Sequence, residues 1–290
     1  MILNFGSINI DHVYTVDHFA KPGESITCPQ HQVFAGGKGF NQSIAIARSG
    51  ARIKHVGLVG KDGLWLKDLL NKENANVDFL ESREGATGHA IIQVDQKGEN
   101  CIIIFGGANK TFEKKFIERV FTADKECDKV LLQNEVNQLE YIIEMAHKNK
   151  RKIILNPSPF TASLLALPLE KINMLILNEI ECQMMGQTEN IPLALKNIIK
   201  KIPNIEILLT KGKDGVLYAH QETIQEFQAI KVANPVDTTA AGDTFTGFFL
   251  GGLERGLSIQ EAIQIGMQAA ALCIQKKGAA ESIPHLKDCI

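Results

Sequence analysis

The sequence lacks the features that mark secreted, membrane-spanning and zinc-binding proteins. Its six cysteines are dispersed, with no C-x-x-C pair and no His/Cys cluster at zinc-ligand spacing. No apolar run approaches the roughly 20 residues that span a bilayer. The first residues lack the basic and apolar regions of a signal peptide. Dispersed cysteines in a chain of this size are typical of a reducing compartment, so we expect a cytoplasmic protein without a membrane segment.

An excess of charge of one sign is also missing. The 290 residues carry 31 Lys and Arg against 33 Asp and Glu, a formal net charge of −2. Nucleic-acid binding depends on clustered basic side chains that neutralise phosphates. Here the densest basic runs, at residues 148–152 and 200–201, lie at the ends of predicted helices. We therefore expect no nucleic-acid partner.

Short apolar runs recur along the chain, and each is followed by a turn and a helical pattern. Unbroken runs of Ile, Leu and Val are typical of parallel strands that are covered on both faces. Their alternation with helices predicts an α/β fold with a doubly wound, mostly parallel sheet flanked by helices. The predicted strands are residues 2–5, 54–59, 129–132, 152–155, 174–177 and 205–209. The predicted helices are residues 41–48, 63–72, 138–149 and 191–201, with two more beginning near residues 243 and 259.

Two segments interrupt this alternation. Residues from about 12 to 34 and from about 88 to 105 resemble strands with no helix between them, and residues 97–100 have the composition of a hairpin turn. We expect these segments to form a small β-sheet that projects from the core as a lid. A further hairpin is predicted over residues 216–229. Because no repeat or linker is visible, the whole chain, 1–290, is expected to form one domain with this lid inserted.

The most informative segment for chemistry is DTTAAGDTF, residues 237–245. Its small residues Ala240, Ala241 and Gly242 let a ligand approach the backbone at the start of a helix, where amide groups attract anions such as phosphate. Asp243, in the first turn, could accept a proton from a hydroxyl group while these amides hold a transferring phosphoryl group. A helix N-cap is the commoner role for such an Asp, but a cap does not need the preceding tract of small residues.

A glycine-rich turn, Gly36-Gly37-Lys38-Gly39, precedes a predicted helix. Glycines permit positive φ and close approach of a ligand. Lys38 and Asn41 could hydrogen-bond hydroxyl groups. The spacing is neither that of a P-loop nor that of a dinucleotide-binding fingerprint. A flexible turn before a helix is the alternative interpretation.

Polar residues follow the first predicted strand and the strand at residues 129–132. Asn9 and Asp11 alternate with apolar residues, so both side chains should face one side of the extended first strand. Together they could clamp a polyol, or they could face solvent at an edge. Glu135 follows the later strand, at the sheet edge where ligands bind in open α/β folds.

Two further strand ends carry candidate nucleotide-binding residues. Asn178 and Glu181 follow the strand at residues 174–177, where they could order a hydrated Mg²⁺ or contact phosphate. The same spacing is also that of a capping box. The turn at residues 210–215 contains two glycines and could wrap a nucleotide or form a plain hairpin.

Taken together and in this order, these segments resemble the ribokinase-like, or pfkB-type, family of sugar kinases. The resemblance runs from residues 6–9 to residues 277–279 and is most specific where the glycine-rich turn and residues 237–243 occur together. It implies ATP-dependent phosphorylation of a sugar at its primary hydroxyl, D-ribose to ribose 5-phosphate. It also implies Mg²⁺, a monovalent cation that is usually K⁺, and a homodimer built through the lid sheet.

The resemblance implies a role for each matching position. Asp243 would be the catalytic base, with Ala240, Ala241 and Gly242 as the anion hole. The sugar would be bound by Asn9, Asp11, Gly37, Lys38, Asn41, Glu135 and Asp243. The nucleotide and its metal would lie along Asn178, Glu181, Thr210, Gly212, Gly215, Gly242 and Met267. The monovalent cation would be bound by the side chains of Asp237 and Ser282 and by the backbone carbonyls of Thr239, Cys273, Lys276 and Gly278.

Three residues depart from the family pattern. Phe40 and Phe248 stand where small residues are usual, and Met267 stands where a polar residue often lies near the adenine. The shape of the sugar pocket therefore stays open, and the acceptor could be deoxyribose, another small sugar or a nucleoside. Two other classes are a sugar-binding protein that has lost catalysis and a dinucleotide-dependent oxidoreductase, which the broken fingerprint disfavours.

Overall fold

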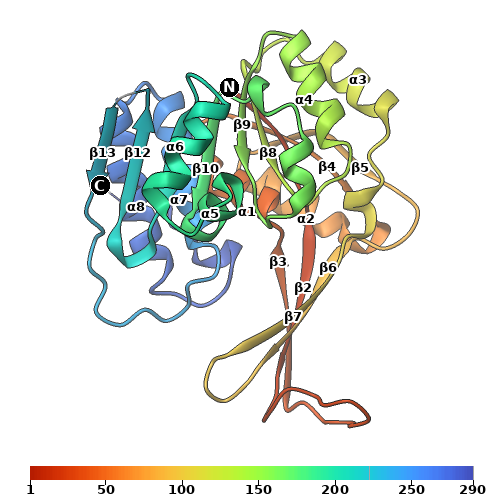
Figure 1. Ribbon diagram of the computed structural model, residues 1–290. Helices are drawn as coiled ribbons and strands as arrows, with labels where there is room; N and C mark the ends of the chain where they lie inside the picture. Colours follow the sequence, from red (N-terminus) through yellow and green to blue (C-terminus); the bar gives the residue numbers. More distant parts are fainter. Residues whose placement is uncertain (222, 290) are drawn as a thin grey trace.

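The computed structural model describes residues 1–221 and 223–289, and within them nine strands form one large sheet (Figure 1). The strands are β1 (Ile2–Phe5), β4 (Ile53–Val59), β5 (Asn76–Ser82), β8 (Lys129–Gln133), β9 (Lys152–Asn156), β10 (Met174–Asn178), β11 (Glu206–Thr210), β12 (Val216–His220) and β13 (Thr223–Phe227). Their order is β13-β12-β11-β10-β9-β8-β1-β4-β5. Neighbours from β11 to β5 are parallel, whereas β12 and β13 form an antiparallel hairpin at one edge.

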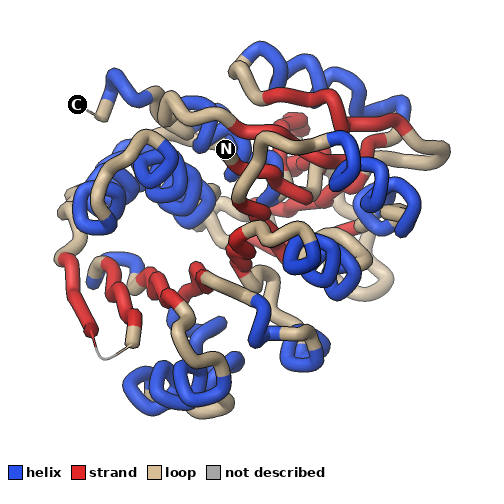
Figure 2. The backbone as a smooth tube through the Cα atoms, turned by 90° about the horizontal axis from the view of Figure 1, so that it is seen from above, coloured by secondary structure: helices blue, strands red, loops and turns tan. Residues whose placement is uncertain are grey.

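Helices cover both faces of this sheet, as the view from above makes plain (Figure 2). They are α1 (Lys38–Arg48), α2 (Leu64–Lys72), α3 (Lys114–Ala123), α4 (Leu139–Lys148), α5 (Glu179–Gly186), α6 (Ile191–Lys201), α7 (Ala241–Glu254) and α8 (Ile259–Cys273). Successive strand residues point to opposite faces, so Leu3 packs with α3 to α6 and its neighbour Ile2 with α1, α2, α7 and α8. Among the described residues, no helix is long and apolar enough to cross a membrane.

The predicted doubly wound α/β architecture is confirmed. Each core strand and helix expected from the sequence is present, with bounds that differ by a few residues. The hairpin expected over residues 216–229 is β12 and β13, although residue 222 in its turn lies outside the described residues. The edge strand β5 and the helices α3 and α5 were not predicted. In α3 the buried residues follow the amphipathic spacing 116, 117, 120, 121, a helical signal that was overlooked.

A second sheet projects from the main body (Figure 1). It consists of β2 (Asn9–Thr15), β3 (Gln30–Gly36), β6 (Gly88–Val94) and β7 (Asn100–Phe105), in the order β3-β2-β6-β7. The central pair, β2 and β6, is parallel, and the two outer pairs are antiparallel. This is the small sheet that the sequence predicts, and it begins earlier in the chain than expected.

The placement of Asn9 and Asp11 at the end of the first strand was wrong, because both belong to β2 in the small sheet. β1 ends at Phe5, and the chain turns before β2 begins. The side chain of Asn109 replaces a strand partner at this turn. Its Oδ1 accepts from the Ile8 N–H (2.9 Å), and its Nδ2 donates to the Ile8 carbonyl (3.0 Å).

The start of α1 packs directly against the end of β1. A Cβ atom at Gly39 would lie 2.3 Å from the Gly6 Cα atom, so neither position has space for a side chain. The Phe40 N–H donates to the Ser7 carbonyl (2.8 Å). The glycine-rich turn is therefore a packed junction between both sheets and α1, which argues against the flexible turn that the sequence left open.

Candidate active site

A cavity of about 260 Å³ lies where the parallel strands β9, β10 and β11 end. Its wall brings together residues that the sequence assigned to the sugar, the anion hole and the nucleotide. These predicted members are Lys38, Asn178, Glu181, Thr210, Ala240, Gly242 and Asp243. The members that were not predicted are Asn156, Ser158, Ile176, Leu177, Thr238 and Thr246. The carboxyl edge of a parallel sheet is where open α/β folds bind ligands.

The residues at the start of α7 line this cavity and carry free backbone N–H groups. Ala240 is the N-cap residue, with a left-handed backbone (φ 60°) and no side-chain cap. The Ala241 N–H donates to the Thr238 carbonyl (3.2 Å). Within residues 1–221 and 223–289, the N–H groups of Gly242 and Asp243 have no hydrogen-bond acceptor. Free amides at the positive end of a helix dipole are suited to bind phosphate.

Asp243 is buried in this turn and is held by two side chains of α1. Asn41 Nδ2 donates to Asp243 Oδ2 (3.1 Å), and Gln42 Nε2 donates to Oδ1 (2.9 Å). The alternative that Asp243 serves as the helix N-cap is wrong, because Ala240 occupies that position. The Asp243 carboxylate raises the pKa of Lys38, with further contributions from Glu135 and Glu181 against the opposing effect of burial. The Lys38 side chain is therefore charged beside the anion-binding turn.

The other predicted sugar-binding residues lie around the start of α1. Gly37 is the N-cap of α1 with φ 91°, and a Cβ atom there would lie 3.0 Å from the Asn9 nitrogen. Glu135 Oε2 accepts from the Lys38 N–H (2.9 Å). Asn9 Oδ1 accepts from Asn109 Nδ2 (2.8 Å), which fixes its orientation. Carboxylate and amide groups of this kind can bind the hydroxyls of a polyol.

Asp11 carries a strongly shifted carboxyl group. Desolvation, together with the negative charges of Glu135 and Glu281, raises the pKa of Asp11 to about 7. The backbone of β3 gives this side chain its space, because a Cβ atom at Gly36 would lie 2.0 Å from Asp11 Oδ2. A half-buried acid whose pKa is raised toward neutrality is typical of functional sites.

Asn178 and Glu181 form the capping box that the sequence left open, and both also line the cavity. Asn178 Oδ1 accepts from the Glu181 N–H (2.9 Å), and Glu181 Oε2 accepts from the Asn178 N–H (2.9 Å). The cap fixes the Glu181 carboxylate at the cavity wall. The structural and the nucleotide-binding interpretations are therefore compatible.

Three predicted nucleotide-binding residues lie away from this cavity wall. Gly212 and Gly215 form the turn after β11 with φ of 53° and 97°. Met267 is half-buried on α8 against the core. The unusual Phe40 and Phe248 are fully buried in the same core, so their side chains pack inside the protein rather than on the cavity wall.

The predicted cation ligands come from the segment before α7 and from the end of α8 and the segment after it: Asp237, Thr239, Cys273, Lys276, Gly278 and Ser282. Asp237 accepts from the N–H groups of Thr239 (2.9 Å) and Gly278 (3.0 Å). Cys273 Sγ lies 3.0 Å from Ser282 Oγ and 3.7 Å from the Thr239 carbonyl oxygen. The Lys276 N–H donates to the Cys273 carbonyl (3.1 Å). Carbonyl, hydroxyl and carboxylate oxygens of this kind are the ligands that hard cations prefer.

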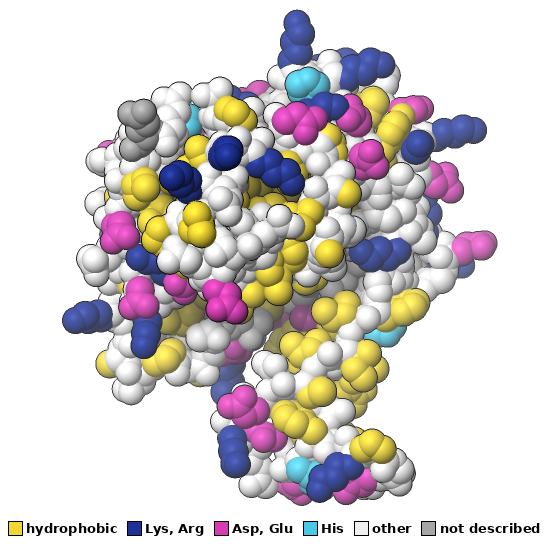
Figure 3. Space-filling model, in the orientation of Figure 1, with side chains coloured by type: hydrophobic (Ala, Val, Ile, Leu, Met, Phe, Trp, Pro, Cys, Tyr) yellow, Lys and Arg dark blue, Asp and Glu magenta, His cyan; other side chains and the backbone are white. Residues whose placement is uncertain are grey.

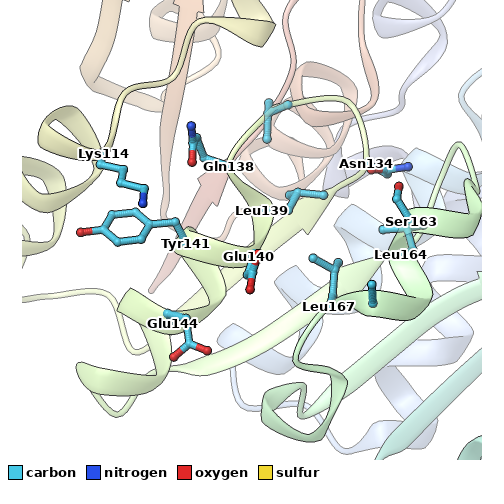
Figure 4. A pocket seen from close by; sticks show the side chains of 12 residues that line it. Lys114, Asn134, Gln138, Leu139, Glu140, Tyr141, Glu144, Ser163, Leu164 and Leu167 are labelled. Atoms are coloured by element: carbon cyan, nitrogen blue, oxygen red, sulfur yellow. The ribbon is translucent and has the colours of Figure 1, made fainter.

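A larger cavity, of about 550 Å³, lies beside α4 (Figure 4). Glu140 and Glu144 line it, and Lys114 Nζ lies 4.9 Å from the centre of the Tyr141 ring. Seven predicted site residues line the smaller cavity, and none lines this one. The volume of a cavity therefore does not identify the candidate active site in this protein.

Sequence reasoning missed a set of buried amides behind Asp243. Gln133 is the last residue of β8, and Asn156 is the last residue of β9. Both occupy the strand-end position that drew attention to Asn178, so the same rule would have found them. Gln42 follows Asn41 in the glycine-rich segment and had no signal of its own.

Comparison with known proteins identifies the family. Residues 1–286 match the pfkB family carbohydrate kinases. The ribokinase of Haemophilus influenzae is 33% identical over 294 residues, covering 96% of this chain and 94% of that protein. The crystal structure of ribokinase from Thermotoga maritima has a TM-score of 0.91 at 32% identity, covering 99% of this chain and 97% of that chain. Ribokinase from Arabidopsis thaliana complexed with ribose and ATP has a TM-score of 0.87 at 30% identity, covering 99% and 96%. With its anion-binding turn, buried carboxylate and projecting sheet, this chain belongs to the pfkB family of carbohydrate kinases.

Proposed function

We propose that this chain is a ribokinase, which transfers the γ-phosphoryl group of ATP to the primary hydroxyl of D-ribose and produces ribose 5-phosphate. The observation that carries the proposal is the meeting of the Asp243 carboxylate, the free N–H groups of Gly242 and Asp243, and Lys38 at one cavity. Ribose as the acceptor is supported by near-full-length similarity to ribokinases, one of them complexed with ribose and ATP.

In this proposal Asp243 accepts the proton of the primary hydroxyl as the hydroxyl oxygen attacks the γ-phosphorus. The bond between the γ-phosphorus and the β,γ-bridging oxygen breaks, and ADP leaves. The N–H groups of Gly242 and Asp243 and the charged Lys38 stabilise the negative charge on the transferring group. Because the fold fixes these donors before substrate binds, they need little reorganisation during transfer.

The sugar would lie between the start of α1 and the small sheet. Its hydroxyl groups would be bound by Asn9, Asp11, Gly37, Lys38, Asn41 and Glu135. The small sheet would act as a lid over the bound sugar, within a single sugar-kinase domain formed by residues 1–290. Its closure would exclude water, which otherwise competes with the sugar as phosphoryl acceptor.

The donor groups beside the cavity fit the nucleotide and two cations. Thr210, Gly212, Gly215 and Met267 would lie along ATP. Asn178 and Glu181 would hold a hydrated Mg²⁺, which neutralises the phosphates of bound ATP. The proposed K⁺ ligands are the side chains of Asp237 and Ser282 and the carbonyl oxygens of Thr239, Cys273, Lys276 and Gly278. Because Asp237 and Thr239 immediately precede Ala240, these ligands would also order the anion-binding turn.

A homodimer through the small sheet is part of the proposal. Hydrophobic side chains gather on this projecting sheet (Figure 3). The large exposed members are Val33, Ile91, Ile102, Ile103, Ile104 and Phe105. All residues of β7 are exposed. Clustered exposed apolar side chains are typical of interaction surfaces, and a second copy of this chain would cover them.

A cytoplasmic location is also proposed. The cysteines at positions 28, 101, 127, 182, 273 and 289 all lie within the described residues, and all six are free. Free cysteines are typical of proteins kept in a reducing compartment. Burial raises the pKa of the Cys127 and Cys182 thiols to about 12, so these two groups are poorly reactive.

Asp243→Asn tests the assignment of the base. The amide keeps the size of the side chain but cannot accept the hydroxyl proton. We expect kcat to fall by about 10²–10⁴-fold, the usual contribution of a general base, while the affinity for ribose is retained. Steady-state ATP turnover gives the first quantity, and calorimetric titration with ribose gives the second. Near-normal turnover would remove Asp243 from this role.

Asp11→Asn tests how much the raised pKa of Asp11 lowers the stability of the folded protein. The raised pKa means that the folded protein retains a proton that the unfolded chain releases near pH 4, so wild-type stability falls as pH rises from about 4 to 7. The variant cannot ionise at this position. We expect it to unfold at a higher temperature than wild type at pH 8, with a smaller difference at pH 5, and to bind ribose more weakly. A difference that does not change with pH would contradict this account.

A panel of acceptors tests the substrate. We expect ATP turnover with D-ribose to exceed that with 2-deoxyribose or a nucleoside in kcat/KM, and to rise when K⁺ is added. Preference for 2-deoxyribose or for the nucleoside would change the acceptor and keep the chemistry. Sugar binding without any ATP turnover would indicate a protein that has lost catalysis. Binding of NAD(H), followed by fluorescence quenching, would favour the oxidoreductase alternative.

A further inference from the structure

A network of hydrogen-bonded side-chain amides extends from Asn156 through Gln42 and Gln133 to Asn4, and Gln42 also contacts Asp243. Gln42 Nε2 donates to Asp243 Oδ1 (2.9 Å) and to Asn156 Oδ1 (3.0 Å). Gln42 Oε1 accepts from Gln133 Nε2 (2.7 Å), which also donates to Asn4 Oδ1 (3.1 Å). Gln42, Gln133 and Asn4 are buried. The Gln133 oxygen has no partner among the described residues, but the hydrogen bonds donated along the network restrict the orientation of each amide.

A backbone carbonyl fixes the direction of the row at its Asn156 end. The Ile176 carbonyl can only accept, so Asn156 Nδ2 points toward it (2.8 Å). Asn156 Oδ1 is then left as an acceptor for Gln42. In the reverse orientation the Gln42 oxygen would face Asn156 Oδ1 and the Asp243 carboxylate. All three groups accept hydrogen bonds, so they would repel one another. Gln42 therefore presents a donor to Asp243.

A second backbone carbonyl fixes the other end. Asn4 Nδ2 donates to the Gly39 carbonyl (2.8 Å), which leaves Asn4 Oδ1 as the acceptor for Gln133. Gln133 Nε2 thus donates to both Asn4 and Gln42, and of the two Gln42 amide atoms only the oxygen can accept this hydrogen bond. The two ends impose the same orientation on Gln42.

We propose that Gln42 is a positioning residue for phosphoryl transfer, a role that rests on the function proposed above. By donating to Oδ1, Gln42 fixes the orientation of the Asp243 carboxylate, and the sugar hydroxyl would approach Oδ2, which accepts from Asn41 Nδ2. Hydrogen bonds donated to a carboxylate favour its charged form. Neither Asn41 nor Gln42 lines the cavity, but Asn41 belongs to the proposed sugar-binding set, whereas Gln42 is fully buried and reaches the site only through Asp243.

Gln42→Glu is the direct test, because it keeps the side-chain length and replaces the donor by a carboxyl oxygen. Two carboxyl groups in contact share a proton, so the base is blocked near neutral pH. At pH 7 we expect kcat to fall about 10- to 100-fold and the KM values for ribose and ATP to change less than about threefold. The acid limb of the kcat–pH profile should move upward by about one pH unit or more, so that activity partly recovers at high pH.

Ser43→Ala is the matched control. Ser43 follows Gln42 on α1, and its Oγ accepts from Asn4 Nδ2 (2.8 Å) and hydrogen-bonds His55 Nδ1 (2.8 Å). It lies in the same buried network but on a branch that does not reach Asp243. We expect Ser43→Ala to lower the unfolding temperature and to keep the wild-type shape of the kcat–pH profile. If Gln42→Glu acted only by disturbing the structure, its kcat–pH profile would keep the same shape as that of Ser43→Ala.

The outcomes separate the two proposals. Wild-type turnover combined with an unshifted profile in folded Gln42→Glu would overturn the role of Gln42 alone. Absence of ATP turnover by the wild type with every acceptor would overturn the proposed function and this inference together. If Gln42→Glu fails to fold, Gln42→Met tests the role of Gln42 instead. It removes the donor without adding a charge, and we expect a lower kcat, an unchanged KM and the same upward shift of the acid limb. A wild-type kcat in Gln42→Met would overturn the role.

Discussion

The hydrogen bonds between the Asp243 carboxylate and α1 hold the candidate active site together. They connect the first turn of α7 to Asn41 and Gln42, which lie 202 and 201 positions away in the chain. Because α1 begins at the glycine junction beside β1, this one carboxylate links the anion-binding turn to both sheets. The proposed phosphate site and the proposed sugar site therefore depend on the same contact.

The charged groups around this contact destabilise the folded protein. Asp243, Glu135 and Glu181 raise the pKa of Lys38 in that order of effect, and Glu135 also raises the pKa of Asp11. The raised pKa of Asp11 is a direct sign of this destabilisation. Sugar hydroxyls and a cation-bound nucleotide would relieve it, which is the usual exchange of stability for function.

The sequence predicted the core well where a signal is local. Unbroken apolar runs predicted the central parallel strands, and the tract at residues 237–243 predicted a helix start, which is the start of α7 at the cavity. The sequence-based prediction failed where contacts between residues far apart in the chain determine the structure. Asn9 and Asp11 seemed to extend the first strand, because only Asn109, far along the chain, shows that the chain turns at Ile8. The amides behind Asp243 were predictable only in part. Gln133 and Asn156 stand at strand ends, whereas Gln42 gave no local signal, and only the fold shows that it contacts Asp243.

A crystal structure of the chain with ribose and a non-hydrolysable ATP analogue tests the central claim most directly. We expect a carboxylate oxygen of Asp243 within about 2.6–3.2 Å of the primary hydroxyl oxygen, with the terminal phosphate on the N–H groups of Gly242 and Asp243. An Asp243 side chain turned away from the hydroxyl, or a phosphate bound elsewhere, would contradict the account.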